Sequence, residues 1–229
     1  MEPTSRIVKR KPTQSFTPPL FTEYAGCSVV PVQEAKAIII PNHYTHSFPA
    51  RWSRTYRVDA ALVTFAYSAN PWLEKFLFHD AVGLLELARL YAPDGHEKNL
   101  LTRAIATAIR QLRIDVPGCE AIVSFADPLH GHHGGIYQAA SWLYLGRSIN
   151  PLAYRASDGS IMSRRSFHDA QGAYRPEGFE KVKTPAKHRY CKPITSRAKR
   201  LLKLTALPYP KSSEPEEIRV LHVVQERME

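Results

Sequence analysis

One stretch of the sequence concentrates residue types that can do chemistry. Asp127 directly follows an apolar run, and three histidines follow it in a glycine-rich loop: His130, His132 and His133. A carboxylate at this point can act as a base or bind a metal, and neutral imidazoles are common metal ligands. In open α/β sheets, ligands bind beyond the carboxyl ends of the strands, which is where Asp127 is expected. A capped turn with solvated histidines would give the same spacing, so both interpretations stay open.

Two other segments could bring reactive side chains to the same edge. Tyr137 lies on the helix predicted after the loop, where its phenol could donate a proton or bind a metal. His43 and Tyr44 follow a helix that Pro41 should end. We therefore expect Asp127, Tyr137 and His43 to form a reactive centre, with Tyr44 beside it. The alternatives are that Tyr137 belongs to the core and that His43 is an ordinary loop histidine.

The connection before the clearest predicted helix is a candidate site for a phosphate-bearing donor. Residues 92–99 lead from a predicted strand into the helix that begins at Leu100. Backbone amides at a helix start bind phosphates, and an acyltransferase of the coenzyme A type would hold its pyrophosphate here. The residues expected to bind the donor are Arg89, Lys98, Asn99, Thr102 and Arg103. The alternative for Arg89 is a plain surface position.

Positive charge is concentrated in the last third of the chain. The formal net charge is +10, and residues 151–200 carry twelve basic and four acidic residues, a net of +8. Residues 181–203 contain nine Lys or Arg and no Asp or Glu. Such a run is either a solvated surface or a site for nucleic-acid phosphates, with aromatics available for stacking, and we favour the second. The predicted contacts are Lys187, Arg189, Tyr190, Lys192, Arg197, Lys199 and Arg200.

Hydrophobic patterns predict the elements that must position these residues. Helical spacing is clearest over 100–112, where two neighbouring apolar rows are followed by Pro117. Further helices are expected at 32–40 and 136–145, and strands at 58–67, 83–91, 121–126 and 218–224. The centre of the chain therefore reads as strand, loop, helix, strand, loop and helix, which predicts an α/β fold.

Composition narrows the class of protein. With 229 residues, 44% hydrophobic and 23% charged, the chain can bury a core and is neither collagen-like nor largely disordered. Three widely spaced cysteines form no disulfide framework, and the basic, polar N-terminus is no secretory signal. No apolar run is long enough to span a bilayer. We expect a cytoplasmic protein with a polyanionic partner.

Several of these motifs together resemble a known family. Ser124-Phe125-Ala126-Asp127-Pro128, Gly135-Ile136-Tyr137-Gln138-Ala139 and Tyr144-Leu145-Gly146 are similar to the phage Mu Mom-like family of DNA adenine modification proteins. Asn42-His43-Tyr44 and Leu207-Pro208-Tyr209-Pro210-Lys211 also fit that family. The resemblance covers residues 33–211, and the block around Asp127 and Tyr137 is its most specific part.

The resemblance implies a fold and an activity. The family is similar in fold to the Gcn5-related N-acetyltransferases, which implies a mixed sheet flanked by helices. It implies conversion of the adenine N6 amine to N6-carbamoylmethyladenine, protection of phage DNA from host restriction, and action in the cytoplasm of a bacterial host. It also implies iron, whose ligands would be His43, Asp127 and Tyr137, and a donor that is acetyl-coenzyme A or another small molecule.

The expected domain organisation has three parts. Residues 1–22 form a flexible arm, 23–150 an acyltransferase-like catalytic domain, and 151–229 a basic nucleic-acid-binding extension packed on it. Asp94-Gly95-His96 departs from the glycine-rich pyrophosphate loop of ordinary acetyltransferases. The alternatives are an ordinary coenzyme A-dependent N-acetyltransferase, a non-catalytic DNA-binding protein and a metal-dependent nuclease. Spacing alone does not determine the oligomeric state.

Overall fold

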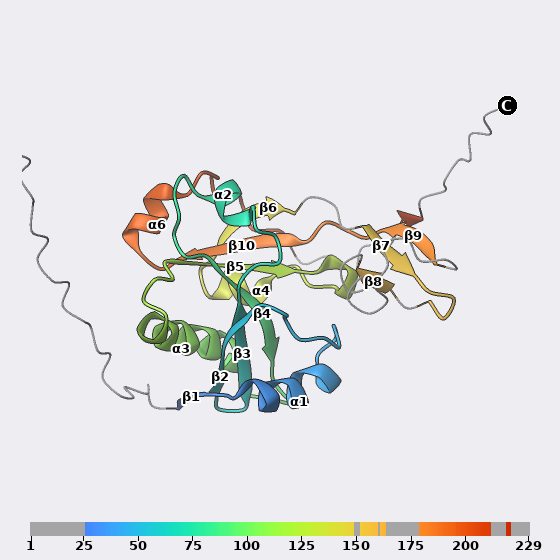
Figure 1. Ribbon diagram of the computed structural model, residues 1–229, viewed down its shortest axis with the longest axis horizontal. Coiled ribbons are helices and arrows are strands. Elements are labelled where there is room, and N and C mark those ends of the chain that lie inside the picture. Colours follow the sequence, from blue (N-terminus) through green and yellow to red (C-terminus); the bar gives the residue numbers. More distant parts are fainter. Residues whose placement is uncertain (1–25, 149–151, 160, 164–178, 212–218, 221–229) are drawn as a thin grey trace, which may run out of the picture.

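The computed structural model describes residues 26–148, 152–159, 161–163, 179–211 and 219–220. Their centre is a seven-stranded mixed sheet in the order β1-β2-β3-β4-β5-β10-β6 (Figure 1). The strands are β1 (Cys27–Val29), β2 (Trp52–Val58), β3 (Ala61–Ala66), β4 (Leu85–Tyr91), β5 (Ala121–Ala126), β10 (His188–Pro193) and β6 (Leu143–Arg147). With helices on both faces, this arrangement confirms the predicted α/β class.

The two central strands pair only briefly. β4 and β5 are the one parallel pair in the described sheet, and their register joins Leu85 with Ile122 and Glu86 with Val123. All other neighbours in this sheet are antiparallel. Beyond Glu86 the ladder stops, and the Ser124 hydroxyl reaches across to donate to the Leu87 carbonyl at 2.8 Å. The carboxyl halves of β4 and β5 therefore part, leaving room between them.

Alternating side chains of the sheet build a core on each face. Ile122 and Tyr190 pack with α3 (Leu100–Asp115) and α4 (Gly135–Ala139), whereas Val123 and Cys191 pack with α2 (Leu73–Leu77) and α6 (Ser196–Leu201). A third cluster lies under α1 (Val32–Asn42). The period-two alternation of a strand thus sends neighbouring residues of β5 and β10 into opposite cores.

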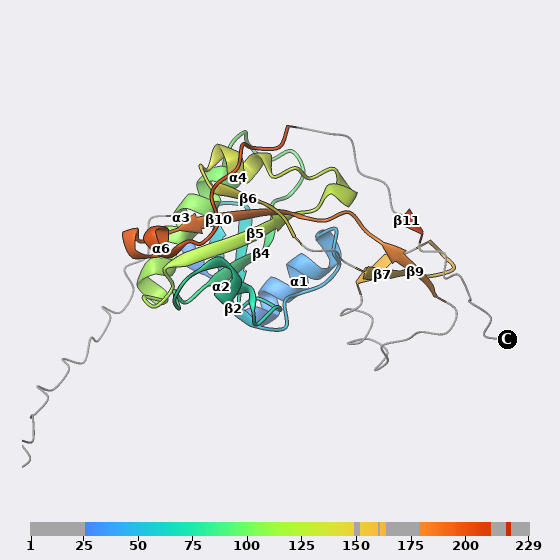
Figure 2. The ribbon, with the colours of Figure 1, turned by 90° about the horizontal axis from the view of Figure 1, so that it is seen from above.

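A second, four-stranded sheet extends from the first (Figure 2). Its order is β11-β9-β7-β8, formed by β11 (Arg219–Val220), β9 (Glu180–Lys183), β7 (Leu152–Arg155) and β8 (Ile161–Ser163). The chain runs from β9 into β10, so the segment predicted as a basic extension also supplies an interior strand of the main sheet. The predicted arm at residues 1–22 lies outside the described residues, as does most of the strand expected at 218–224.

Three predicted elements need correction. The strand expected at 58–67 is β3 alone, because the chain turns at Asp59, whose φ is +51°. β3 pairs with β2, a strand that was not predicted. The helix expected at 136–145 ends at Ala139, since Ser141 has a φ of +56° and Leu143 begins β6. The helix at 32–40 continues to Asn42, because a proline in a last turn removes only one hydrogen bond.

Other predicted elements are confirmed. The strand at 121–126 is β5 with the expected bounds, and the strand expected at 83–91 is β4. The helix at 100–112 is α3, which continues to Asp115 before Pro117. The apolar patterns of 100–112 and 121–126 are strong, which is why the sequence locates these two elements well, whereas Glu86 and Arg89 interrupt the pattern of β4.

Candidate active site

A cavity of about 500 Å³ lies where β4 and β5 part. β4 contributes Glu86–Leu90 and β5 contributes Ser124–Ala126, while the loop before α4 closes another side with residues 131–135. His43 and Tyr44 reach the cavity from the end of α1, and Lys187 reaches it from the chain entering β10. Its volume is typical of small-molecule sites.

Asp127 directly follows β5 and the cavity residue Ala126, although it is not itself among the residues that line the cavity. Its Oδ1 accepts the Leu129 N–H at 3.1 Å and so caps the short helix η1 (Pro128–His130). Its Oδ2 lies 2.8 Å from the Nζ of Lys187, which lines the cavity. The pKa shifts of Tyr44 and His132, two lining residues, both include an effect of the Asp127 charge. Asp127 therefore both caps a turn and brings a carboxylate to the site, so the two interpretations of its position are compatible.

His43 is buried and neutral at physiological pH. Burial, and next the Arg89 charge, lower its pKa from 6.5 to about 4. The Thr45 backbone N–H donates to His43 Nδ1 at 3.2 Å, and the Thr45 hydroxyl lies 2.9 Å from the same atom. Because Nδ1 accepts, the proton of the neutral ring belongs on Nε2. His43 can therefore donate a hydrogen bond into the cavity.

Arg89 holds the loop that carries His43 and Tyr44. Its Nε donates to the Ser47 carbonyl and its Nη2 to the Ser47 hydroxyl, each at 2.9 Å. Two bonds to one residue fix the planar guanidinium, which also lines the cavity. Arg89 therefore lines the cavity and positions the loop, and its binding of a donor stays a prediction.

Tyr137 belongs to both the core and the cavity. Its ring packs 5.1 Å from that of Trp142 and 5.2 Å from that of Tyr190. Its hydroxyl lies 2.8 Å from the Ser124 hydroxyl, and because the one Ser124 proton goes to the Leu87 carbonyl, Tyr137 is the donor to Ser124. Burial raises its pKa to about 12, so the phenol keeps its proton at neutral pH. The structure brings Tyr137, His43 and Tyr44 to one cavity, as predicted.

The other residues predicted to bind the donor lie elsewhere. Lys98, Asn99, Thr102 and Arg103 are not among the residues that line the cavity, although Leu101 is. Arg103 instead lies 3.3 Å from both Asp59 and Glu97 in exposed ion pairs. Asn99 precedes α3 with a φ of +67°. The start of α3 therefore forms part of the surroundings of the cavity, and donor binding there stays a prediction.

Several residues predicted to contact nucleic acid are buried or bound within the protein. Tyr190 has no exposed surface and donates its hydroxyl to the His133 carbonyl at 2.6 Å, so it cannot stack on a base. Arg189 is buried, donates to the Arg147 carbonyl at 3.0 Å and lies over the Phe76 ring. The ammonium of Lys192 donates to the Ala140 carbonyl at 3.0 Å. The sequence did not predict that these side chains are buried or bonded within the protein, because β10 carries basic residues although it lies inside the sheet.

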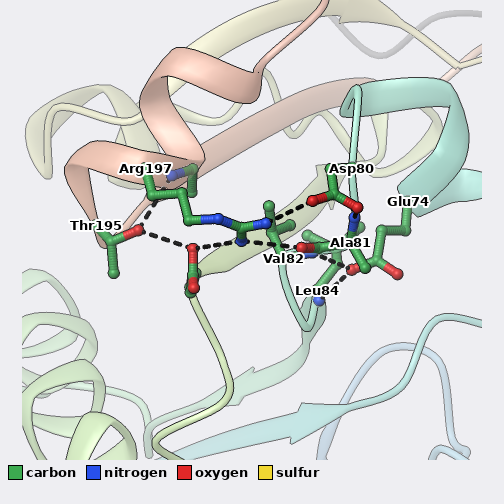
Figure 3. Close-up of polar contacts among 9 residues, drawn as sticks. Glu74, Asp80, Ala81, Val82, Leu84, Thr195 and Arg197 are labelled. Carbon is green, nitrogen blue, oxygen red and sulfur yellow. Dashed lines mark hydrogen bonds and ion pairs between the residues drawn. The ribbon is translucent and has the colours of Figure 1, made fainter. Parts of the chain in front are cut away.

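Arg197 joins α6 to the starts of β4 and β5 (Figure 3). Its guanidinium pairs with Asp80 at 2.7 Å and with Glu120 at 3.1 Å, and donates to the Ala81 carbonyl at 3.0 Å. Glu74 supports the same region by accepting the backbone N–H groups of two residues, Val82 and Leu84. Lys187 faces the cavity, which leaves Lys199 and Arg200 as the exposed members of the predicted set.

Two cavity residues were not predicted from the sequence. Ser124 is buried and bridges Leu87 to Tyr137. Glu86 lines the cavity on β4, and burial raises its pKa. A polar residue inside an otherwise apolar strand was the available signal in both cases, because burial of such a group requires a partner or a function.

The predicted iron ligands do not fit a metal as they are arranged. Among the described residues, no three His, Cys, Asp or Glu side chains are grouped so that they could hold a metal ion. The Lys187 ammonium, 2.8 Å from Asp127 Oδ2, would repel a metal ion, and Nε2 of His43 carries a proton. The Tyr137 hydroxyl is bonded to Ser124. Iron therefore stays a prediction from the family resemblance, and no step below passes through it.

Within the described ranges, no helix is long and apolar enough to cross a membrane. This is consistent with the absence of any long apolar run in the sequence.

Comparisons with known proteins identify a family that this chain matches. The model of the Mom protein family matches residues 26–211, which include every strand of the main sheet and the whole cavity. A similar protein is the methylcarbamoylase mom of Escherichia phage Mu, which is 28% identical over 166 residues. The match covers 63% of this chain and 68% of the phage protein.

Proposed function

The chain belongs to the Mom protein family, and we propose that it is a DNA-modifying enzyme that converts adenine to N6-carbamoylmethyladenine. Similarity to the methylcarbamoylase mom of Escherichia phage Mu supports this activity. The observation that carries the proposal is the convergence of His43, Tyr44, Tyr137 and the Asp127–Lys187 pair on one cavity. The product would protect phage DNA from host restriction nucleases inside the bacterial cell.

The reaction replaces one N6–H bond of adenine by an N6–CH2 bond. The donor is a small molecule with a carbamoylmethyl group whose CH2 carbon bears a leaving group. The N6 lone pair forms the new bond, and the leaving group departs with the electron pair of the broken bond. The released proton goes to a base at the cavity. Acetyl-coenzyme A alone would give an N6 amide, so it does not supply this product.

Asp127 is the base that we assign. It lies next to the cavity, paired with the lining residue Lys187, and each of its oxygens keeps a second lone pair. His43 is a poor acceptor by comparison, because the single lone pair of Nδ1 is engaged and Nε2 is protonated. Lys187 balances the Asp127 charge and presents an ammonium to the cavity, where it can bind a carboxamide oxygen of the donor. The His43 Nε2–H is a further hydrogen-bond donor, and the Tyr137 hydroxyl oxygen is a further acceptor.

Adenine N6 lies inside the duplex, so the enzyme must take the base out of the helix or capture it single-stranded. A cavity of about 500 Å³ with an open side is large enough for a base together with a small donor.

Two features of the main sheet support the proposed likeness in fold to the Gcn5-related N-acetyltransferases. They are the parting of the parallel strands β4 and β5 and the order of the seven strands.

The experiment is to express the chain in bacteria, hydrolyse the DNA to nucleosides and measure the mass of deoxyadenosine. We expect a fraction that carries a carbamoylmethyl group and that is absent from cells with an empty vector. Acetylated deoxyadenosine would indicate an ordinary acetyltransferase. Unmodified deoxyadenosine together with salt-dependent DNA binding by the purified protein would indicate a non-catalytic DNA-binding protein. Either result would overturn the proposal.

A further inference from the structure

Four aromatic rings from two distant segments meet at one side of the cavity. The Tyr44 ring stacks on His43 with centroids 4.4 Å apart and an interplanar angle of 29°. The same ring lies 4.5 Å from the His130 ring and 5.3 Å from the His132 ring. We call these four residues the aromatic wall. Three of them, His43, Tyr44 and His132, line the cavity.

The aromatic wall consists of rings and contains no Lys or Arg side chain. Such rings suit a planar heterocycle, whereas a phosphate would favour Lys or Arg.

Tyr44 is the exposed member of the aromatic wall. The Tyr44 residue is 40% exposed, although its ring contacts three imidazoles. No residue within the described ranges forms a hydrogen bond with its hydroxyl. The position of the ring is therefore set by aromatic packing, and Tyr44 keeps exposed surface at the cavity.

We propose that Tyr44 is the stacking platform that receives the adenine taken out of the DNA, and that it acts through its ring and not through its hydroxyl. This inference rests on the proposed function and extends it to the recognition of the base. Stacking of a base on an aromatic side chain changes affinity by about 5- to 150-fold, so loss of the ring should reduce modification by about that factor.

The first test compares substitutions of Tyr44 in the nucleoside assay. We expect Tyr44→Phe and Tyr44→Trp to keep most of the modified deoxyadenosine and Tyr44→Ala to lose it by about 5- to 150-fold. Tyr67→Ala is the matched control, because Tyr67 is 49% exposed at the end of β3 and does not line the cavity. If Tyr44→Phe loses as much product as Tyr44→Ala, the hydroxyl is the functional group and the inference is wrong.

The second test does not depend on product. A duplex with one unpaired 2-aminopurine in place of adenine is titrated with the purified protein, and the fluorescence of 2-aminopurine reports whether the base is stacked. We expect quenching with wild type and Tyr44→Phe, and unquenched fluorescence with Tyr44→Ala. Quenching without modified deoxyadenosine would refute the proposed reaction and keep the stacking role. Modification by wild type together with equal quenching by Tyr44→Ala would refute the stacking role alone.

Discussion

The environment of His43 determines which proton it can give or take. Its Nδ1 accepts from Thr45, and burial beside Arg89 favours the neutral ring. A neutral imidazole with its proton on Nε2 serves as a hydrogen-bond donor to a base or donor oxygen. The same feature disfavours His43 as a metal ligand through Nε2, because that atom would first have to lose its proton.

We expect His43 to titrate with a midpoint of about 4 in the folded protein. Because this value lies below 6.5, the unfolded chain binds a proton that the folded chain does not, and stability falls as the pH decreases from about 6.5 to about 4. NMR titration of the imidazole signals measures the midpoint, and His43→Asn identifies the signal. A midpoint near 6.5 would contradict the described environment.

Among individual residues, the sequence predicted cavity positions better for the proposed reactive centre than for the proposed donor-binding site. Tyr137 and His43 lie in short blocks next to predicted elements and line the cavity, and Asp127 is paired with the cavity residue Lys187. Lys98, Asn99, Thr102 and Arg103 were assigned by analogy with a helix start, and they do not line the cavity. Which side of a helix start faces a cavity depends on the packing of α3, and spacing does not reveal that.

Gly134 shows how one element of the site depends on another. It precedes α4 with a φ of +86°, and a Cβ at this position would collide with the Tyr190 ring of β10. The Tyr190 hydroxyl in turn bonds to the His133 carbonyl at 2.6 Å. The loop that closes the cavity therefore rests directly on a strand that comes from far along the chain.

We predict that Gly134→Ala destabilises the fold more than Gly95→Ala does. Both glycines have a positive φ, but a Cβ at Gly95 would meet nothing within 4 Å. The strain of the left-handed conformation costs about 1–2 kcal/mol at either site, and the collision with Tyr190 adds about 1–3 kcal/mol. Urea unfolding measures both, and equal losses would contradict the close approach.

Arg197 belongs to the scaffold of the parallel strands. Its contacts with Asp80 and Glu120 hold the starts of β4 and β5 together, at the end opposite to the cavity (Figure 3). We expect Arg197→Ala to lower the melting temperature by a few degrees and to leave DNA affinity unchanged. Lys199→Ala, on the same helix but exposed, is the control that should leave melting unchanged. Weaker DNA binding by Arg197→Ala with unaltered melting would return Arg197 to the DNA-contacting set.

In the whole molecule, the basic run between residues 181 and 203 is distributed over several environments. β9 carries exposed Lys181 and Lys183, β10 is largely buried, and α6 follows the far end of β10. Because β10 is antiparallel to β5, its start lies beside the end of β5 and hence beside the cavity. β9 precedes that start, whereas α6 lies at the opposite end of the sheet (Figures 1 and 2).

This arrangement predicts which lysines contact the DNA backbone. Replacing Lys181 and Lys183 by Ala should weaken DNA binding and reduce the slope of log K against log salt by about two, one for each lost phosphate contact. The matched pair Lys199→Ala and Arg200→Ala should change the slope little. Binding is measured by fluorescence anisotropy over a range of salt concentrations. A larger effect from the α6 pair would show that DNA lies at the other end.

The sequence predicted the α/β class and the elements with strong local patterns, but not the assembly of the sheet. β10 pairs with β5 and β6 through contacts that join residues more than forty positions apart. Its charged residues concealed a strand that is buried by tertiary packing. Position in the sheet is decided by such long-range pairing, and a single sequence carries little information about it.

The central claim is that the Asp127 site modifies adenine in DNA, and the mass of deoxyadenosine from cells expressing Asp127→Asn tests it most directly. The amide can still accept the Leu129 N–H, so η1 should be retained, while the base is lost. Asp94→Asn is the control, since Asp94 is exposed outside the cavity. We predict a loss of carbamoylmethyl deoxyadenosine by about a hundredfold or more with Asp127→Asn and none with Asp94→Asn. Full modification by Asp127→Asn would contradict the account.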